Sequence, residues 1–361
     1  MSERLAASVF RLPVERIRDG YYSDAYFNST RELLIARGRR PTVLMQVFCK
    51  REDAVLGGID EALAVLRECA GLRADDGSWQ PGWEQLDVRA LHEGDRIDPR
   101  ETVLTIAGDY TLFAHLETVY LGCLTRRTGV MSNVAGTVAA ADGKPIFYFP
   151  ARHEHWLVQT GDGWAAHVAG AIGVSTDAQA SWWGGRGIGT VPHALIAAYG
   201  GDTVLAAVEF AERYQREMNI TVLVDFDNDS VGTALATARA LGSRLWGVRL
   251  DTAEDLVDAS LADRPDAERL RGVSPELVRV VRGALDEHGF GDVRIVASGG
   301  FDAERIARFE RERVPVDAYG VGASLLRGGY DFTADVVEVN GRPCAKAGRG
   351  RRPNPRLEPV R

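Results

Sequence analysis

Short apolar runs alternate with longer amphipathic segments through the second half of the chain. The apolar runs predict β-strands at residues 145–149, 221–224, 245–250, 293–297 and 316–319. Between them, apolar residues recur at helical spacing, which predicts helices at residues 154–170, 192–199, 231–241, 275–288 and 303–311. This alternation is typical of parallel strands joined by crossover helices, and over this length it favours a complete or partial α/β barrel over an open sheet.

The first part of the chain follows a different pattern. We predict a strand at residues 41–50 and a helix at residues 60–69. Residues 90–109 predict two short strands around Gly-Asp and Asp-Pro turns, similar to the strand pairs of lipoyl carrier domains. The lysine that would carry a cofactor is absent, which favours a structural module. We therefore predict an α+β sandwich-like domain over residues 1–112 and a barrel domain over residues 113–330.

The C-terminal segment carries a hairpin signal. Residues 335–339 and 342–346 flank Asn340-Gly341, the pair preferred in a two-residue type I′ turn. The residues beyond this hairpin are basic and rich in proline. We predict that residues 331–361 form a hairpin and an extended arm that packs on the first domain.

Composition narrows the class of protein. The net charge of −8 argues against general nucleic-acid binding, which depends on basic surfaces. The first residues are interrupted by charge and no apolar run is long enough to span a bilayer, so we expect a soluble, cytoplasmic protein without a membrane segment. The four cysteines are scattered, which predicts reduced, mostly buried thiols and no structural zinc.

Two glycine-rich turns follow successive predicted strands near the end of the barrel. The first contains Ser298, Gly299 and Gly300, and the second contains Gly320 and Gly322. Such turns expose backbone N–H groups and helix N-termini, which bind phosphate in the late loops of barrels. One turn alone is weak evidence, because glycine often ends strands for steric reasons. Two in succession favour a phosphate site.

Acidic residues end the two preceding strands. Asp225 and Asp251 are placed to bind ribose hydroxyls directly or through Mg²⁺, which prefers a few carboxylates together with substrate oxygens. Arg249 and Asp251 alternate along one strand, so both side chains point to the same face. An alternative for Asp251 is to cap a helix that starts at Thr252.

His193 is the most informative histidine. It follows Pro192, which suits the first turn of a helix, so His193 lies where free N–H groups would favour a phosphate. The alternative is an ordinary structural hydrogen bond. The spacing of His153 and His155 does not favour a metal site, whereas the neighbouring Arg152 can hold a carboxylate or phosphate bidentately.

Several segments resemble the nicotinate phosphoribosyltransferase family, in matching order along nearly the whole chain. These are YSDAYF, MQVFCKREDAVLGGIDEAL, FAHLETVYLGCLTRRT, ARHEHW, GTVPHALI, VLVDFDND, GVRLD, IVASGGFD, YGVGASL and the tail from KAGR to LEPV. The resemblance implies an incomplete, type II phosphoribosyltransferase barrel with an N-terminal sandwich domain. It also implies a homodimer or larger homo-oligomer in which the N-terminal domain helps to close the site of a neighbouring subunit. Lys50 and Arg51 are candidates for reaching across the subunit interface. The alternative for these two residues is a solvent-exposed surface.

The resemblance also implies residue roles. Tyr26 is similar to the tyrosine that stacks on the pyridine ring, although its chemistry alone equally suits a core position. Arg152 is similar to the arginine that holds the anionic substrates. His193 matches the histidine that the family phosphorylates from ATP, and Thr190 lines that site.

The remaining roles concern phosphoribosyl pyrophosphate. By resemblance, Asp225, Arg249 and Asp251 surround this substrate and its Mg²⁺, with Arg249, Asp251 and His193 as the catalytic groups. The glycine-rich turns at 298–300 and 320–322 hold the 5′-phosphate. The implied reaction joins nicotinate to the phosphoribosyl group, coupled to ATP hydrolysis, in NAD biosynthesis.

Three other functions are considered. A nicotinamide-using relative selects the amide with an aspartate, and Asp177 is close to that position, although the alignment places Thr176 there. A quinolinate phosphoribosyltransferase would require a denser basic cluster for a second carboxylate. A non-catalytic phosphosugar-binding barrel is disfavoured by the two strand-end aspartates and His193. In ARHEHW, histidine replaces a second arginine that is common in the family, so carboxylate recognition differs in detail.

Overall fold

The computed structural model describes residues 4–360, which form two compact units. Unit 1 contains the described residues up to Ser132 and those from Gly328 onward, and unit 2 contains Asn133–Arg327. The helix α4 (Glu117–Ala140) runs through the division at Ser132. The division lies later than the predicted boundary after residue 112, because the first turns of α4 belong to the core of unit 1.

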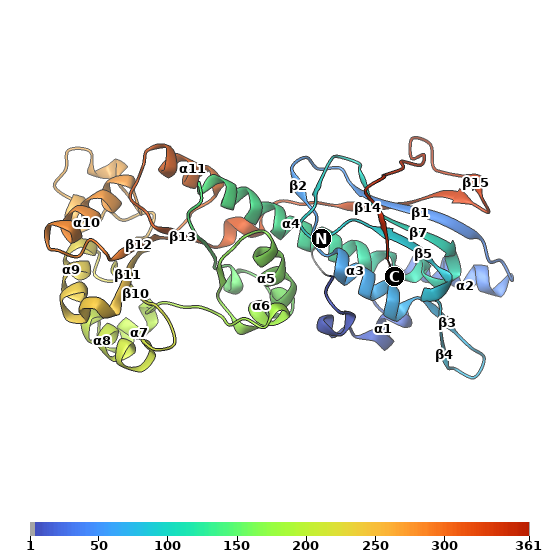
Figure 1. The fold of residues 1–361 in the computed structure, drawn as a ribbon, viewed down its shortest axis with the longest axis horizontal. Helices are drawn as coiled ribbons and strands as arrows, with labels where there is room; N and C mark the ends of the chain where they lie inside the picture. The colour runs from blue at the N-terminus through green and yellow to red at the C-terminus, as the bar shows by residue number, and fades with distance from the viewer. Residues whose placement is uncertain (1–3, 361) are drawn as a thin grey trace. The chain divides into compact units, whose positions relative to one another are not determined.

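Unit 1 is built on an antiparallel sheet of six strands in the order β15-β14-β1-β7-β5-β16 (Figure 1). The strands are β1 (Thr42–Cys49), β5 (Asp87–Ala90), β7 (Thr102–Asp109), β14 (Phe332–Val339), β15 (Arg342–Pro343) and β16 (Glu358–Pro359). The predicted hairpin is confirmed: β14 pairs with β15 across Asn340 and Gly341, whose φ angles of 48° and 73° are those a type I′ turn requires. The arm that follows pairs with β5 through β16.

The predicted pair of strands in residues 90–109 exists, but the two strands do not pair with each other. The first, β6 (Arg96–Ile97), pairs with β2 (Ala54–Val55), whereas β7 pairs with β1 and β5. β7 therefore belongs to the six-stranded sheet, whereas β6 forms a separate two-stranded sheet with β2. A short ladder between β3 (Gly71–Arg73) and β4 (Trp79–Pro81) completes the strands of this unit.

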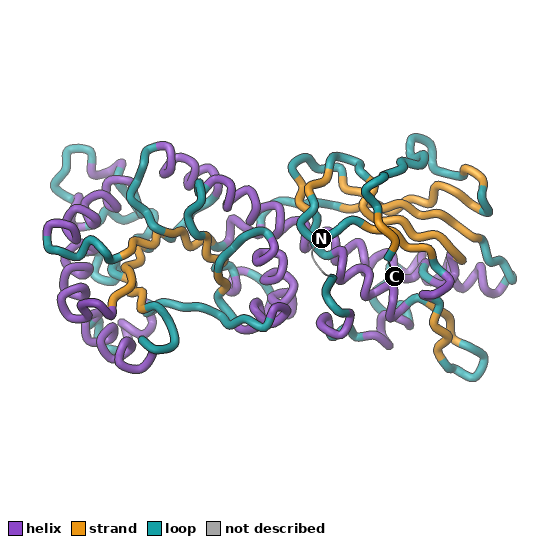
Figure 2. The backbone as a smooth tube through the Cα atoms, in the orientation of Figure 1, coloured by secondary structure: helices purple, strands orange, loops and turns teal. Residues whose placement is uncertain are grey.

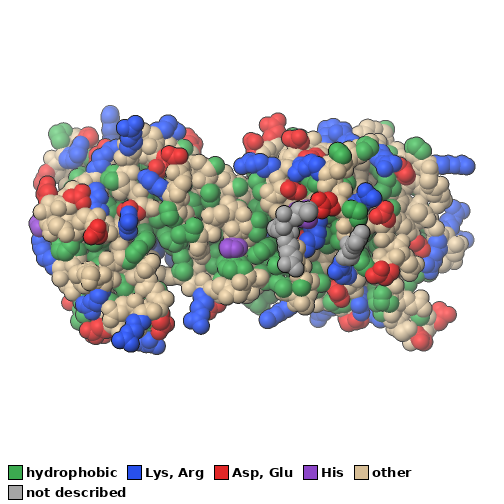
Figure 3. All heavy atoms as spheres, viewed as in Figure 1, with side chains coloured by type: hydrophobic (Ala, Val, Ile, Leu, Met, Phe, Trp, Pro, Cys, Tyr) green, Lys and Arg blue, Asp and Glu red, His purple; other side chains and the backbone are tan. Residues whose placement is uncertain are grey.

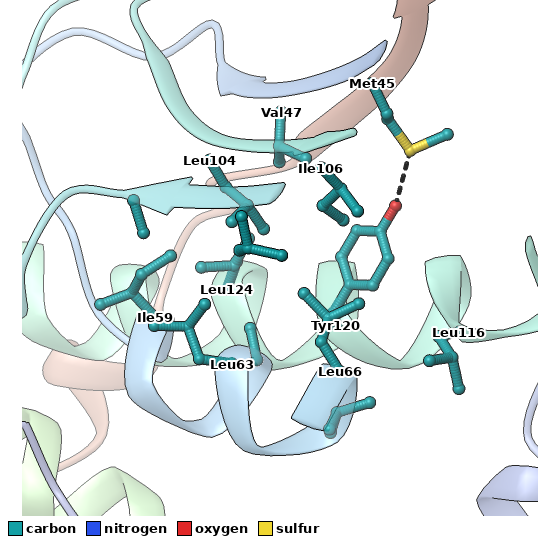
Figure 4. Packing of buried hydrophobic residues seen from close by; sticks show 14 of the residues in the cluster. Met45, Val47, Ile59, Leu63, Leu66, Leu104, Ile106, Leu116, Tyr120 and Leu124 are labelled. Carbon is teal, nitrogen blue, oxygen red and sulfur yellow. Dashed lines mark hydrogen bonds between the residues drawn. The ribbon is translucent and has the colours of Figure 1, made fainter. Parts of the chain in front are cut away.

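Helices pack one face of this sheet and enclose the core of unit 1. They are α1 (Val14–Arg18), α2 (Ala25–Ala36), α3 (Ile59–Cys69) and the first part of α4. Figure 4 shows Leu104 and Ile106 of β7 against Leu63 and Leu66 of α3, and all four side chains are almost fully buried. In the same cluster, the buried Tyr120 hydroxyl lies 2.9 Å from the Met45 sulfur. This core fixes α4, which continues into unit 2.

Unit 2 is a curled, entirely parallel sheet with helices on its outer face (Figure 2). Its order is β10-β11-β12-β13-β8-β9, with β8 (Ile146–Tyr148), β9 (Gly173–Val174), β10 (Ile220–Leu223), β11 (Leu245–Leu250), β12 (Arg294–Ala297) and β13 (Ala318–Val321). The helices are α5 (Gln159–Val168), α6 (Asp177–Ala180), α7 (His193–Ala198), α8 (Thr203–Tyr214), α9 (Ser230–Leu241), α10 (Pro275–Glu287) and α11 (Ala303–Arg311). The predicted partial barrel is confirmed.

A single extended segment, here called the strap (residues 184–191), closes the gap between the sheet edges. The Ile188 N–H donates to the Val174 carbonyl of β9 at 2.8 Å. Three residues later, Val191 forms a parallel bridge with Val222 of β10, and its N–H donates to the Thr221 carbonyl at 2.9 Å. The strap thus replaces a missing strand, and α7 begins directly after it.

Charged side chains of both signs are intermixed over the face shown in Figure 3. Among residues 4–360, none of the helices combines the length and apolar character that a membrane crossing requires.

His115 is a buried titratable group in unit 1. Its side chain is 0% exposed, its ring centroid lies 6.4 Å from that of Trp79, and neither ring nitrogen has a hydrogen-bond partner in the described structure. Burial, together with the positive charge of Arg31, lowers the pKa of His115 from 6.5 to about 3. The folded protein therefore disfavours the imidazolium form that the unfolded chain adopts in mild acid.

We predict that His115→Leu flattens the acid dependence of stability. As the pH falls below 6.5, this histidine should lower the free energy of unfolding of the wild type by about 1.4 kcal/mol per pH unit, until its folded pKa of about 3. The variant lacks this loss. Urea denaturation of both proteins between pH 7 and pH 5 measures it, and parallel pH curves would contradict the prediction.

Candidate active site

A cavity of about 580 Å³ lies at the carboxyl ends of the parallel strands of unit 2. Most of the predicted site residues line it: Arg152, Thr190, His193, Arg249, Asp251, Ser298, Gly299, Gly300, Gly320 and Gly322. Parallel pairing brings these residues together, since all the strands end on the same side of the sheet. Of the predicted set, Asp225 and Tyr26 are not part of the lining.

Arg249 is the centre of a hydrogen-bonded network on the cavity wall. Its Nε donates to Ser298 Oγ at 2.8 Å, its Nη2 to Asp251 Oδ2 at 3.2 Å, and its Nη1 to Thr190 Oγ1 at 3.4 Å. Its guanidinium also lies 5.2 Å from the centre of the Phe149 ring. Arg249 of β11 and Asp251, the residue after the end of this strand, therefore point to the same side, as the alternation predicts.

The Asp251 side chain belongs to the cavity wall and does not cap a helix. Its Oδ1 accepts from Ser298 Oγ at 2.8 Å, and no helix begins at Thr252 in the described chain. The segment after β11 is irregular as far as Asp258. The helix-cap alternative for Asp251 is therefore wrong.

His193 is the first residue of α7, with Pro192 at the N-cap position. Its Nε2 lies 3.2 Å and 3.3 Å from the two carboxylate oxygens of Asp225. The His193 side chain is 44% exposed, whereas that of Asp225 is only 6% exposed. The pKa of Asp225 is raised by its burial and by the charge of Asp251, against the opposing effect of His193. Asp225 thus lies behind a cavity-lining histidine and orients its ring.

The two turns need glycine for different reasons. Gly299 and Gly300 adopt φ angles of 84° and 67°, which strain any other residue. Gly320 is required for space, because a Cβ there would lie 2.6 Å from the Phe149 ring. The first turn is also held from outside the cavity, since Arg305 donates to the Gly299 carbonyl at 2.9 Å.

The cavity includes residues that the sequence analysis did not assign. Ser175, Glu254, Asp302, Ser324 and Arg327 all contribute to the lining. Each follows a strand of the barrel, so position after a strand end was the available signal. Their side-chain types alone did not distinguish them from other loop residues.

Asp177 and Thr176 are not part of the lining, whereas their neighbour Ser175 is. The Asp177 carboxylate accepts from the Gly187 N–H of the strap at 2.8 Å. Thr176 caps α6 by accepting from the Gln179 N–H at 3.1 Å. These contacts do not favour the use of Asp177 to select an amide substrate.

Tyr26 lies on α2 of unit 1 and is 61% exposed, with its hydroxyl 3.4 Å from Asp24 Oδ2. The core alternative for Tyr26 is therefore wrong. Lys50 and Arg51 are also exposed, and the Arg51 guanidinium lies 5.6 Å from the centre of the Tyr330 ring.

Within residues 4–360, no group of three or more His, Cys, Asp and Glu side chains is arranged to hold a metal ion. His155 Nδ1 accepts from the Leu157 N–H, whereas His153 lines the cavity beside Gly322. Asp225 and Asp251 are the carboxylates that the sequence predicts for a Mg²⁺ ion, and of the two only Asp251 lines the cavity. The four cysteines are free, and Cys344 is exposed.

We predict that Asp177→Ala loosens the strap. Loss of the carboxylate acceptor frees the Gly187 N–H, so trypsin should cleave after the exposed Arg186 severalfold faster than in the wild type. Asp177→Asn keeps an acceptor oxygen and serves as the control. Equal cleavage rates for the alanine and asparagine variants would show that this bond does not hold the strap.

Comparisons with known proteins support one family. Residues 24–128 match the model of the quinolinate phosphoribosyl transferase N-terminal domain. The chain is 34% identical over 270 residues to a nicotinate phosphoribosyltransferase of Mycobacterium tuberculosis, an alignment that covers 72% of this chain and 55% of the relative. The chain thus spans about half the length of the curated relatives it matches.

Solved structures share the fold. A nicotinate-nucleotide pyrophosphorylase from Pyrococcus furiosus has 33% identity and a TM-score of 0.79, with 94% of this chain and 80% of that chain covered. The human nicotinic acid phosphoribosyltransferase has 19% identity and a TM-score of 0.66, covering 91% of this chain and 77% of that one. Together with the geometry of the cavity, these similarities show that the chain belongs to the nicotinate phosphoribosyltransferase family of type II phosphoribosyltransferases.

Proposed function

We propose that the protein is an enzyme that transfers the phosphoribosyl group of phosphoribosyl pyrophosphate to nicotinate, in NAD biosynthesis. The products are nicotinate mononucleotide and pyrophosphate. The observation that carries the proposal is the single cavity in which two glycine-rich turns, Arg249 and Asp251 meet in a member of this family. A phosphorylated sugar needs anion-binding turns and polar groups for its hydroxyls, and both are present on one wall.

The phosphoribosyl end of the substrate is assigned to the turns after β12 and β13. Backbone N–H groups at Gly299, Gly300 and Gly322 are suited to the 5′-phosphate, because glycine allows close approach of the backbone. Asp251, already oriented by Ser298 and Arg249, is suited to accept from ribose hydroxyls. Mg²⁺ bound with the substrate, near Asp225 and Asp251, would neutralise charge on the departing pyrophosphate.

The reaction breaks the bond between the anomeric carbon and the pyrophosphate oxygen and forms a bond from that carbon to the pyridine nitrogen. Positive charge develops on the ribose as the pyrophosphate leaves. The enzyme helps by holding the pyridine nitrogen in line and by placing guanidinium groups near the leaving oxygens. No strong general base is required, since the nicotinate nitrogen attacks without losing a proton.

The pyridine end is assigned to Arg152 and Tyr26. Arg152 lines the cavity, and its planar fork is suited to the nicotinate carboxylate. The exposed Tyr26 ring is suited to stack on a pyridine from outside its own unit, which is consistent with sites shared between the subunits of a homodimer or larger homo-oligomer. Position 153 is a histidine, so Arg152 supplies the guanidinium of the ARHEHW segment to the cavity.

ATP is proposed as a co-substrate that phosphorylates His193. The γ-phosphoryl group would move to the ring, breaking its bond to the ADP oxygen and forming a nitrogen–phosphorus bond that water later hydrolyses to free phosphate. Nε2 faces Asp225, so Nδ1 is the nitrogen available for this bond. Asp225 would hold the proton on Nε2 and stabilise the positive charge of the ring.

Two observations bear on other substrates. The Asp177 carboxylate binds the strap, which disfavours selection of nicotinamide. Quinolinate is favoured by the match of residues 24–128 to a quinolinate phosphoribosyl transferase domain, and its second carboxylate would need Arg249 or Arg327 as a cationic partner in addition to Arg152. A non-catalytic phosphosugar-binding protein would retain the turns without needing His193 paired with Asp225.

The substrate is tested by incubating the purified protein with phosphoribosyl pyrophosphate, Mg²⁺ and each of the three pyridines, with and without ATP, followed by mass spectrometry. We expect nicotinate mononucleotide from nicotinate, with more product when ATP is present. Product from quinolinate or nicotinamide alone would replace nicotinate as the substrate. No turnover with any pyridine would favour the binding protein.

We predict that His193→Ala separates transfer from ATP hydrolysis. The variant should lose ATP hydrolysis during turnover and the benefit of ATP, while slow ATP-independent transfer persists because Arg249, Asp251 and the turns remain. Phosphate release and mononucleotide formation are measured in parallel, and His288→Ala, at the exposed C-cap position of α10, is the control. Unchanged coupling in His193→Ala would remove the assigned role of this histidine.

A further inference from the structure

We propose that Asn228 and Asp258 are positioning residues that hold the two strand-end aspartates, Asp225 and Asp251, at a fixed spacing. They do so by joining the loop after β10 to the loop after β11. We call these two residues and their hydrogen bonds the loop clamp. The inference rests on the proposed function, because it concerns how that site is held before substrate binds.

Asn228 supplies one half of the loop clamp. Its backbone N–H donates to the Asp225 carbonyl at 3.0 Å, which ties it directly to the end of β10. The side-chain Nδ2 donates to the Val257 carbonyl at 2.8 Å. The backbone carbonyl of Asn228 accepts from the Ala259 N–H at 2.9 Å. Asn228 therefore binds Asp225 on one side and the loop after β11 on the other.

Asp258 supplies the other half. Its side chain is 0% exposed, and Oδ2 accepts from the N–H of Ser230, the first residue of α9, at 3.0 Å. Its Oδ1 accepts from Ser260 N at 3.0 Å and from Ser260 Oγ at 2.6 Å. A buried carboxylate is costly unless donors surround it, so these bonds fix both loops around one point. Neither Asp258 nor Asn228 lines the cavity.

The loop clamp would keep Asp225 and Asp251 at a fixed separation. β10 and β11 pair in parallel, so the carboxylates of Asp225 and Asp251 follow adjacent strand ends, where like charges repel each other. Each follows the end of a strand and is succeeded by irregular chain. Bonds between the two loops oppose that repulsion and keep the aspartates ready for ribose hydroxyls and a substrate-bound cation.

Asn228→Gly is the sharpest test, because it removes the side-chain bond and preserves the backbone. Asn228 has a φ of 57°, a conformation that glycine adopts freely, so the variant should fold. Asp229→Ala is the matched control. Asp229 is the next residue in the same loop and caps α9 by accepting from the Gly232 N–H at 2.9 Å, but that bond stays within its own loop.

We expect Asn228→Gly to raise the KM for phosphoribosyl pyrophosphate about tenfold while kcat changes by less than about twofold, with a melting temperature close to that of the wild type. Asp229→Ala should lower the melting temperature and leave KM unchanged. Calorimetric titration of phosphoribosyl pyrophosphate with Mg²⁺, in the absence of any pyridine, should show the same loss of affinity in Asn228→Gly alone.

Equal affinity and KM in Asn228→Gly and the wild type would overturn the loop clamp. An equal rise in KM in both variants would also overturn it, because the effect would then follow the stability of α9. Absence of turnover in the wild type would instead count against the proposed function, and the calorimetric titration would still test the clamp. If the wild type shows neither turnover nor binding, both proposals fail.

Discussion

The register between β11 and β12 is the constraint on which the site depends. Leu250 pairs with Ala297 in a parallel ladder, so the next residue on each strand, Asp251 and Ser298, leaves the sheet at the same level. Their side chains are then 2.8 Å apart, and Arg249 joins both. A slip of one residue would turn Arg249 and Asp251 away from the cavity, because side chains alternate across a strand. The chemistry of the wall is therefore a consequence of backbone pairing.

The strap likewise places side chains through backbone hydrogen bonds, in the part of the barrel that lacks a strand. Ile188 and Val191 of the strap are bonded to β9 and β10 by backbone hydrogen bonds, and Gly187 lies so close to the Thr176–Asp177 peptide that a Cβ would be 2.7 Å from it. The strap also contains Thr190, and His193 lies two residues after its end. A histidine that must meet Asp225 at the end of β10 is thus delivered by a segment bonded to that strand. The segment that closes the barrel is therefore also the segment that places His193.

The sequence predicted those elements whose burial leaves a clear pattern. Most residues of the parallel strands β10 to β13 are buried, so these strands appear as largely apolar runs, and the residues after them were found with them. By contrast, α2 has no buried residue and β9 has only two residues, so neither leaves a periodic pattern. The helix α8 is amphipathic and follows a capping residue, Asp202, so its sequence does carry a helix signal.

Residues whose role depends on the tertiary fold could not be predicted in this way. Asp258 looks like an ordinary polar residue in an irregular segment, and only the fold shows that it is fully buried against Ser230. The pairing of β7 with β1 and β5 depends equally on distant chain. Arg327 and Glu254 were missed for the same reason, because strand-end position alone does not separate cavity-lining residues from solvent-exposed neighbours.

The charges of the cavity bear on which substrates suit it. Its lining contains three arginines (Arg152, Arg249 and Arg327) and three carboxylates (Asp251, Glu254 and Asp302), so these formal charges cancel. Phosphoribosyl pyrophosphate is strongly anionic, and such a wall can accept it only with help from backbone N–H groups and from cations that enter with the substrate. Under the proposed function, this balance suits binding of the substrate as its Mg²⁺ complex.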